Sequence, residues 1–290
     1  MTTAYPFVIK LGTFEVTGFG IMMMVGFLMG GWIIDRDLRR RRFNPDYASD
    51  IVFAAVIGGI VGAKLWYVAL HGPDALFSRG GLVWYGGFAG GALAVVINGW
   101  LKKVPFWWTA QLVAPALPAA YALGRVGCFM VGDDYGYPTD VPWAVAFPQG
   151  LPPTTVDSLT RFGWVAPAGL DPSTVLAVHP TQLYEVGIMT AAFMLIWKLA
   201  DRPWGTGWLF GLYLALAGAE RFFVELFRAK DDRLLAGFTL AQATSVAILL
   251  LGVALIALRK GAVGMEPGKY LGGIARERAG KTGREREKAG

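Results

Sequence analysis

The polar residues that could do chemistry gather in three short segments, each at an end of an apolar stretch. Arg125 lies in GRVGCFMVGDDYG (Gly124–Gly136), and Glu185 lies in HPTQLYE, which begins at His179. Arg221 opens the third segment, RFFVELFR. Ionisable side chains at the ends of apolar segments are costly and are functional candidates. Because arginine forks bind phosphate bidentately, Arg125 and Arg221 together indicate a phosphate clamp.

The third segment has a helical spacing that places its charges on one face. Arg221, Glu225 and Arg228 stand at positions i, i+4 and i+7. A glutamate between two arginines can hold both guanidinium groups in place. The same pattern is typical of a structural ion-pair network that ties helices together. The spacing alone favours neither interpretation.

Other polar residues have simpler explanations. Tyr85 stands among glycines in GGLVWYGGFAGG, where close packing by a neighbouring helix is favoured over ligand contact. His179 precedes a proline and suits a hydrogen bond at a helix end, although acid–base chemistry is the alternative. Cys128, the only cysteine, is expected to be a small buried hydrophobe. Asp133 and Asp134 lack a third ligand nearby, so no metal is predicted.

Composition indicates how these segments must be held. The 290 residues are 54% hydrophobic and only 17% charged, whereas soluble domains carry about 25% charged residues. The charges cluster between long apolar runs, which is typical of a protein that crosses a membrane several times. The net charge of +6 does not indicate nucleic-acid binding, because the basic residues stand at helix ends and in the tail.

Seven apolar stretches are long enough to span a bilayer as helices. They are Val16–Ile34, Ile51–Leu70, Leu82–Leu101, Phe106–Gly124, Thr181–Ala200, Thr206–Phe227 and Phe238–Leu258. Eighteen of the 27 Lys and Arg residues fall on one side of this arrangement. Basic loops face the cytoplasm, so the N-terminus is predicted outside and the C-terminus inside. All the segments named above then fall in the outer half of the bilayer.

The connections and the tail complete the predicted organisation. Residues 1–258 form one transmembrane catalytic domain with outer loops at 71–81, 133–180 and 228–237. The middle loop is long and rich in Pro, Gly and Thr, which indicates either a functional loop or disorder. Residues 259–290 form a basic, disordered cytoplasmic tail that is expected to meet anionic lipid.

Together these segments resemble the prolipoprotein diacylglyceryl transferase family. GRVGCFMVGDDYG is similar to the family signature, with its GR-x-G-x-F start and closing glycine, and HPTQLYE agrees almost letter for letter. RFFVELFR matches the arginine–glutamate–arginine segment, and GAKLWYV and GGLVWYGG match two further blocks. The resemblance runs from about Gly12 to Leu258. Several blocks in the right order make it specific.

The resemblance implies a reaction and a place for it. The diacylglyceryl group of phosphatidylglycerol moves to the lipobox cysteine of a secreted prolipoprotein, which leaves a thioether and glycerol phosphate. The implied fold is all-α, with seven transmembrane helices and a small periplasmic head, in the bacterial inner membrane. A monomer is expected, with no cofactor and no nucleic acid.

The resemblance also implies residue roles. Arg125 and Arg221 would bind the phosphate and stabilise its developing charge. Tyr85, His179 or the leaving phosphate would take the thiol proton. The other residues implied to bind phosphatidylglycerol, by orienting Arg221 or shaping the head-group pocket, are Gln182, Tyr184, Glu185, Glu225 and Arg228.

Three positions depart from the family pattern. Tyr85 stands where histidine is common, and a phenol is a poorer base than imidazole at neutral pH. Cys128 replaces an asparagine, and Ala217 stands where a tyrosine is common. These departures leave the acceptor open, so a transferase of the same fold with a different acceptor is one alternative. An anion transporter is another, but it would need access from both sides of the membrane.

Overall fold

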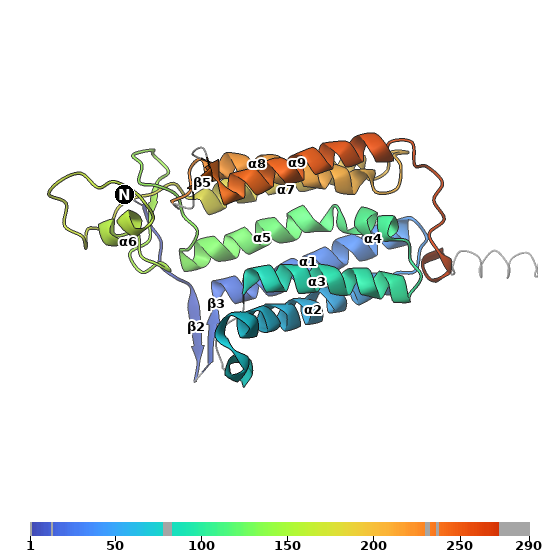
Figure 1. The fold of residues 1–290 in the computed structure, drawn as a ribbon, viewed down its shortest axis with the longest axis horizontal. Helices are drawn as coiled ribbons and strands as arrows, with labels where there is room; N and C mark the ends of the chain where they lie inside the picture. Colours follow the sequence, from blue (N-terminus) through green and yellow to red (C-terminus); the bar gives the residue numbers. More distant parts are fainter. Residues whose placement is uncertain (1, 13, 78–82, 230–232, 236–237, 273–290) are drawn as a thin grey trace, which may run out of the picture. The chain divides into compact units, whose positions relative to one another are not determined.

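The computed structural model describes residues 2–12, 14–77, 83–229, 233–235 and 238–272. Helices occupy each of the seven apolar stretches predicted from the sequence (Figure 1). They are α1 (Gly18–Arg40), α2 (Asp46–His71), α3 (Trp84–Leu101), the pair α4 (Phe106–Val113) and α5 (Ala116–Val131), α7 (Thr181–Leu199), α8 (Trp208–Glu225) and α9 (Leu240–Arg259). The prediction of a mainly helical protein is confirmed.

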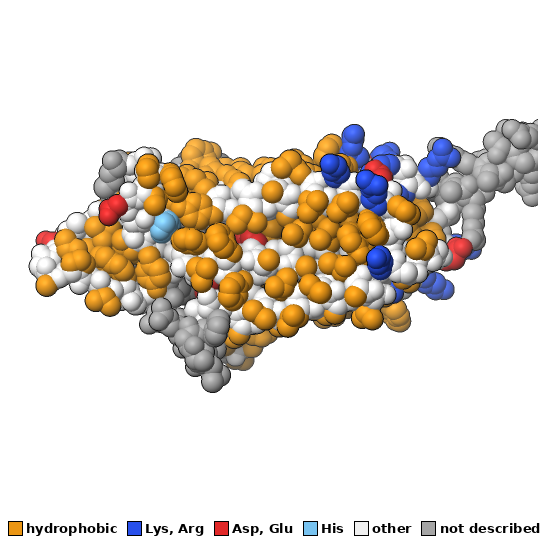
Figure 2. Space-filling model, turned by 90° about the horizontal axis from the view of Figure 1, so that it is seen from above, with side chains coloured by type: hydrophobic (Ala, Val, Ile, Leu, Met, Phe, Trp, Pro, Cys, Tyr) orange, Lys and Arg blue, Asp and Glu red, His pale blue; other side chains and the backbone are white. Residues whose placement is uncertain are grey.

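Several of these helices have the length and hydropathy of membrane spans. In the described part of the chain, α1, α2 and α9 each meet both conditions, and the pair α4–α5 adds a fourth span if it is counted as one. Their outer surfaces are apolar, as the exposed Phe53, Ile57 and Leu250 side chains illustrate. On the face that Figure 2 shows, hydrophobic side chains cover most of the helical surface, and the Lys and Arg side chains lie toward one end of it. These features are those of a membrane protein.

Proline accounts for the break between α4 and α5. Pro115 is the N-cap of α5 and has no N–H with which to continue the preceding helix. Pro118 lies in the first turn of α5, where a missing N–H does no harm. The stretch predicted as a single helix at Phe106–Gly124 is therefore two, and the second continues to Val131.

The described residues divide into two compact units. The first combines the described residues of Met1–Met29, Ala114–Trp204 and Trp208–Gly261, and the second combines those of Gly30–Val113, Gly205–Gly207 and Ala262–Gly290. In the first unit α5 packs on α7, α7 on α8, and α8 on α9 (Figure 1). Two apolar cores fill the spaces between these helices, one around Ile196 and Leu209 and the other around Met189.

The long connection at 133–180 is folded around a core of its own. It carries β4 (Val145–Ala146), which pairs in parallel with β1 (Thr2–Thr3), and α6 (Val156–Arg161). The buried side chains of this core are Tyr135, Val145, Phe147, Leu159, Val178 and Ala229. The N-terminal segment adds a hairpin of β2 (Val8–Leu11) and β3 (Phe14–Thr17), and a short β5 (Arg233–Leu235) pairs with β6 (Phe238–Thr239).

The second unit is built on the close packing of α2 against α3. The 3-10 helix η1 (Pro73–Phe77) lies in the connection between these two helices. A Cβ on Gly86 would lie 2.4 Å from the carbonyl oxygen of Gly62, and one on Gly90 would lie 2.4 Å from that of Gly58. The glycines beside Tyr85 therefore serve helix packing, as the sequence favoured.

The first part of the basic tail makes defined contacts in the second unit. Leu271 is fully buried, and its carbonyl oxygen accepts a hydrogen bond from the Asn44 N–H. The Tyr270 hydroxyl donates to Asp50 at 2.6 Å. The rest of the predicted tail, from residue 273, and parts of the predicted outer loops at 78–81, 230–232 and 236–237 lie outside the described residues.

Candidate active site

Arg125 is held on three sides by groups of the first unit. Its Nη1 donates to Asp134 Oδ2 at 2.8 Å, and its Nη2 donates to the Tyr121 hydroxyl at 3.0 Å. Its Nε lies 2.8 Å from Glu185 Oε2. Because every nitrogen of the guanidinium group has a partner, the group is fixed in one orientation without substrate.

Glu185 joins Arg125 to Arg221. Its side chain is fully buried in α7, and Oε1 accepts from the Tyr121 hydroxyl at 3.2 Å and lies 3.9 Å from Arg221 Nη1. The two arginines proposed to hold phosphate thus share one carboxylate, with α5, α7 and α8 each supplying a residue. Tyr121 is a residue of the candidate site that was not predicted from the sequence. Its place one helical turn before Arg125 was the available signal.

The predicted arginine–glutamate–arginine arrangement is present, with one difference. Arg221 Nη2 lies 2.8 Å from Glu225 Oε2, and Arg228 Nε lies 3.8 Å from the same oxygen. The Glu225 Oε1 atom accepts from the Thr239 hydroxyl at 3.1 Å. The helix ends at Glu225, so Arg228 lies beyond it rather than on the predicted helical face. The Nη1 atom of Arg221 is buried and has no hydrogen-bond partner among the described residues.

Asp134 is the second residue of the candidate site that was not predicted as such from the sequence. Its carboxylate forms ion pairs with both Arg125 and Arg228, and its backbone has a φ of 57°, in the left-handed region. Although burial opposes ionisation, Arg228 and Arg125 hold the pKa of Asp134 below its ordinary value. The acidic pair directly after the signature was visible in the sequence, but the long-range contact with Arg228 was not.

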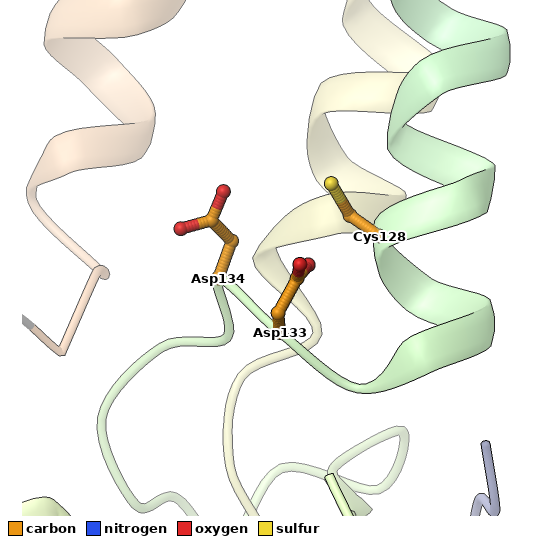
Figure 3. Close-up of side chains that lie close together, drawn as sticks. All are labelled: Cys128, Asp133 and Asp134. Carbon is orange, nitrogen blue, oxygen red and sulfur yellow. The ribbon is translucent and has the colours of Figure 1, made fainter. Parts of the chain in front are cut away.

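Cys128, Asp133 and Asp134 form a compact group (Figure 3). One ligand atom from each lies within 4.8 Å of the others, so the expectation that no third ligand lies near the two aspartates is wrong. The turn after α5, with Gly132 at a φ of 70°, brings the aspartates back toward Cys128. Two arginines already neutralise the Asp134 carboxylate, which leaves it a weak ligand for a cation. Burial and the charge of Asp134 raise the pKa of Asp133 to about 6.

The HPTQLYE segment holds the aspartate turn in place. The Thr181 hydroxyl donates to the carbonyl oxygen of Asp134 at 2.7 Å, and the Gln182 side-chain amide donates to that of Asp133. Gln182 is fully buried, so these contacts fix the loop rather than face an open pocket. The predicted helix start at Thr181 is confirmed.

His179 and Tyr184 form a separate pair at the start of α7. The His179 Nδ1 atom lies 3.0 Å from the Tyr184 hydroxyl oxygen, which also accepts from Trp143 Nε1 at 2.8 Å. The imidazole packs edge-on against Phe227. Partial burial lowers the pKa of His179, which favours the neutral ring. Trp143 comes from the long connection and was not predicted as a site residue.

Tyr85 lies in the first turn of α3 in the second unit. The residue is 62% exposed, and its ring contacts the Trp84 ring edge-on. Its proposed role in proton transfer stays a prediction.

Comparison with known proteins shows the family of the chain. The family model described as prolipoprotein diacylglyceryl transferase matches residues 6–258. A phosphatidylglycerol–prolipoprotein diacylglyceryl transferase of Geobacter sulfurreducens is 33% identical over 268 residues, which cover 87% of this chain and 94% of the relative. Enzymes with the same name from Legionella pneumophila and Shewanella sp. are 33% and 30% identical, and each is covered over 94% of its length. The chain is therefore a member of the prolipoprotein diacylglyceryl transferase family.

Proposed function

We propose that this protein transfers the diacylglyceryl group of phosphatidylglycerol to the cysteine thiol of a prolipoprotein. The curated relatives carry this activity in their names. The observation that supports it most directly is the set of three arginines, Arg125, Arg221 and Arg228, gathered around buried carboxylates. Such a set suits a lipid whose phosphate must first be bound and then released with added negative charge.

The reaction breaks one C–O bond and forms one C–S bond. The cysteine sulfur attacks the carbon of the diacylglyceryl group that is bonded to the phosphate oxygen. The C–O bond breaks, and its electron pair leaves with that oxygen as glycerol phosphate. A free thiol is a weak nucleophile, so a nearby base or positive field must favour the thiolate. Arg221 is the best placed of the arginines to meet the leaving phosphate, because its buried Nη1 has no hydrogen-bond partner among the described residues.

The other site residues have supporting roles in this proposal. Glu185 and Glu225 hold the arginines, and Gln182 fixes the turn that carries Asp134. Tyr85 or His179 accepts the thiol proton. His179 can use only one ring nitrogen for this purpose, since Nδ1 already contacts Tyr184.

The membrane arrangement belongs to the same proposal. Seven spans with the N-terminus outside and the C-terminus in the cytoplasm would place the arginines in the outer half of the inner membrane. Lipid tails could then remain in the bilayer while the head group reaches the site. Residues 1–258 would form the catalytic part of a monomeric enzyme.

The test is transfer with purified components. The protein in detergent is incubated with phosphatidylglycerol and a synthetic peptide that contains a lipobox cysteine. The expected products are a peptide heavier by one diacylglyceryl group and an equal amount of glycerol phosphate. A peptide with serine in place of the cysteine, and phosphatidylcholine in place of phosphatidylglycerol, should give neither. Lipid binding without any product from the complete mixture would contradict the proposed acceptor.

A further inference from the structure

Asp134 places a carboxylate where an anionic ligand of the arginines would bind. Its Oδ2 atom accepts from Arg125 Nη1 at 2.8 Å, and its Oδ1 atom accepts from Arg228 Nη2. One oxygen thus faces each guanidinium group. A phosphodiester presents two charged oxygens in a similar way and carries the same single negative charge.

We propose that Asp134 is an internal competitor for the lipid phosphate, which occupies an anion position between Arg125 and Arg228 until phosphatidylglycerol displaces it. This inference rests on the function proposed above. It gives Asp134 a role in setting the affinity for the lipid head group, whereas Arg125 and Arg228 supply the groups of this anion position and Arg221 meets the phosphate as it leaves.

The carboxylate is able to leave without disturbing the backbone that carries it. The carbonyl oxygen of Asp134 is fixed by the Thr181 hydroxyl at 2.7 Å, and the N–H of the nearby Gly136 donates to the carbonyl oxygen of His179 at 2.9 Å. The Asp134 side chain itself is 39% exposed. Rotation of this side chain alone would move the carboxylate away from the arginines.

The arginines do not depend on Asp134 for their positions. Arg125 keeps its contacts with Glu185 at 2.8 Å and with the Tyr121 hydroxyl at 3.0 Å. Arg228 keeps its ion pair with Glu225, at 3.8 Å. Departure of the Asp134 carboxylate would therefore leave two oriented guanidinium groups with unsatisfied donors. Exchange of carboxylate for phosphodiester keeps the net charge of the site constant.

A purely structural Asp134 predicts the opposite effect of mutation. If Asp134 positioned the arginines, its removal would weaken lipid binding. If it competes with the lipid, removal strengthens binding, because the lipid no longer has to displace a charged group. The sign of the change in affinity separates the two roles.

The experiment compares Asp134→Asn with wild type in detergent. Binding of short-chain, water-soluble phosphatidylglycerol is measured by calorimetry, with the matched phosphatidylcholine as the zwitterionic control. We expect the dissociation constant for phosphatidylglycerol to fall about tenfold, an energy difference of about 1.4 kcal/mol. The KM for the lipid in the transfer assay should fall with it.

Two further variants make the result secure. Asp134→Gly also removes the carboxylate and suits the left-handed backbone at a φ of 57°, so it serves if the asparagine variant is unstable. Asp140→Asn removes one negative charge from an exposed position on the same connection and should bind lipid like wild type. Unchanged or weaker binding by both Asp134 variants would overturn the proposal. Because binding is measured without transfer, this result is separate from a failure of wild type to modify the peptide, which would overturn the proposed function instead.

Discussion

Arg125 and Glu185 form a buried ion pair between α5 and α7, with Nε and Oε2 2.8 Å apart. The glutamate side chain is fully buried and that of the arginine is 15% exposed. Such a pair is a poor source of stability compared with apolar packing, but breaking it leaves an uncompensated buried charge. Its value here lies in orientation, because Glu185 fixes Arg125 and also faces Arg221.

Replacement of Glu185 tests this relationship. Glu185→Gln removes the negative charge that two arginines share, so we expect a loss of about 3–5 kcal/mol in stability. Transfer activity should fall as well, since the arginines lose their common anchor. Thermal unfolding in detergent and glycerol phosphate release measure the two effects. The matched control is Glu15→Gln on the β2–β3 hairpin, whose exposed pair with Lys10 should matter little. Wild-type unfolding and activity in Glu185→Gln would show that the pair is dispensable.

Arg221 should be the most sensitive of the arginines in catalysis. Its buried Nη1 has no hydrogen-bond partner among the described residues, whereas each nitrogen of Arg125 is in contact with a protein group. Arg221→Ala should lower kcat/KM by about 10²–10³-fold, the usual effect of removing one donor that stabilises developing charge. Arg221→Lys should restore little, because an ammonium group lacks the planar fork.

The control for this prediction is Arg161→Ala in α6. Like Arg221, Arg161 is paired with a carboxylate, that of Asp157, but its side chain is 75% exposed. The variant should keep wild-type kinetics in the same peptide assay. Full activity of Arg221→Ala would remove Arg221 from the site.

The sequence was sufficient to predict features that depend on local pattern. Apolar length located a helix in each predicted stretch, and Pro180 marked the start of α7 at Thr181. The spacing of Arg221 and Glu225 predicted their ion pair, because residues four apart share a helical face.

Features that depend on distant contacts were not predictable in this way. The pairing of Asp134 with Arg228 joins residues 94 positions apart and requires a left-handed backbone at Asp134. Because α8 ends at Glu225, Arg228 lies outside the helix, although the helical spacing of charges in the sequence continues to Arg228. Cys128 came close to the aspartates because α5 ends in a tight turn rather than running on.

The raised pKa of Asp133 gives a pH dependence of stability. Burial, with the neighbouring Asp134, raises it from 3.8 to about 6. The folded protein therefore binds this proton more tightly than the unfolded chain, so its contribution to stability is complete below about pH 4 and is lost as pH rises through 6. The contribution amounts to at most about 3 kcal/mol.

Asp133→Asn should remove this dependence. The variant is expected to gain stability relative to wild type at pH 7.5 and to gain less at pH 4.5, where Asp133 is largely protonated. The measurement is the midpoint of thermal unfolding in detergent at the two pH values. Asp140→Asn, which changes an exposed carboxylate on the same connection, should shift the midpoint equally at both. An equal shift for Asp133→Asn would contradict the raised pKa.

The closing glycine of the signature has a steric reason. A Cβ on Gly136 would lie 2.4 Å from the carbonyl oxygen of Phe227 and 2.8 Å from the Cβ of His179. Gly136→Ala should therefore push apart the segments that carry Asp134, His179 and Arg228, with a loss of about 1–3 kcal/mol in stability and most of the activity. Gly187→Ala in α7 is the matched control, because its Cβ would meet nothing within 4 Å. A normal unfolding midpoint for Gly136→Ala would contradict this account.

The identity of the proton acceptor is the last point that mutation can decide. Tyr85→Phe removes the hydroxyl and keeps the ring. If the Tyr85 hydroxyl accepts the thiol proton, kcat should fall about 10²-fold or more in this variant. Tyr85→His should retain activity at pH 7, since imidazole is the better base there. Trp84→Phe, which changes the neighbouring ring in the same helical turn, is the control for packing.

The alternative acceptor is His179, and its test uses the contact with Tyr184. If Tyr85→Phe keeps wild-type kcat, His179→Gln should abolish transfer, and Tyr184→Phe should alter the pH profile by removing the hydroxyl 3.0 Å from Nδ1. Loss of activity in Tyr85→Phe with normal activity in His179→Gln assigns the proton to Tyr85. Full activity in both variants would leave the departing phosphate as the acceptor, and the rate would then depend on the arginines alone.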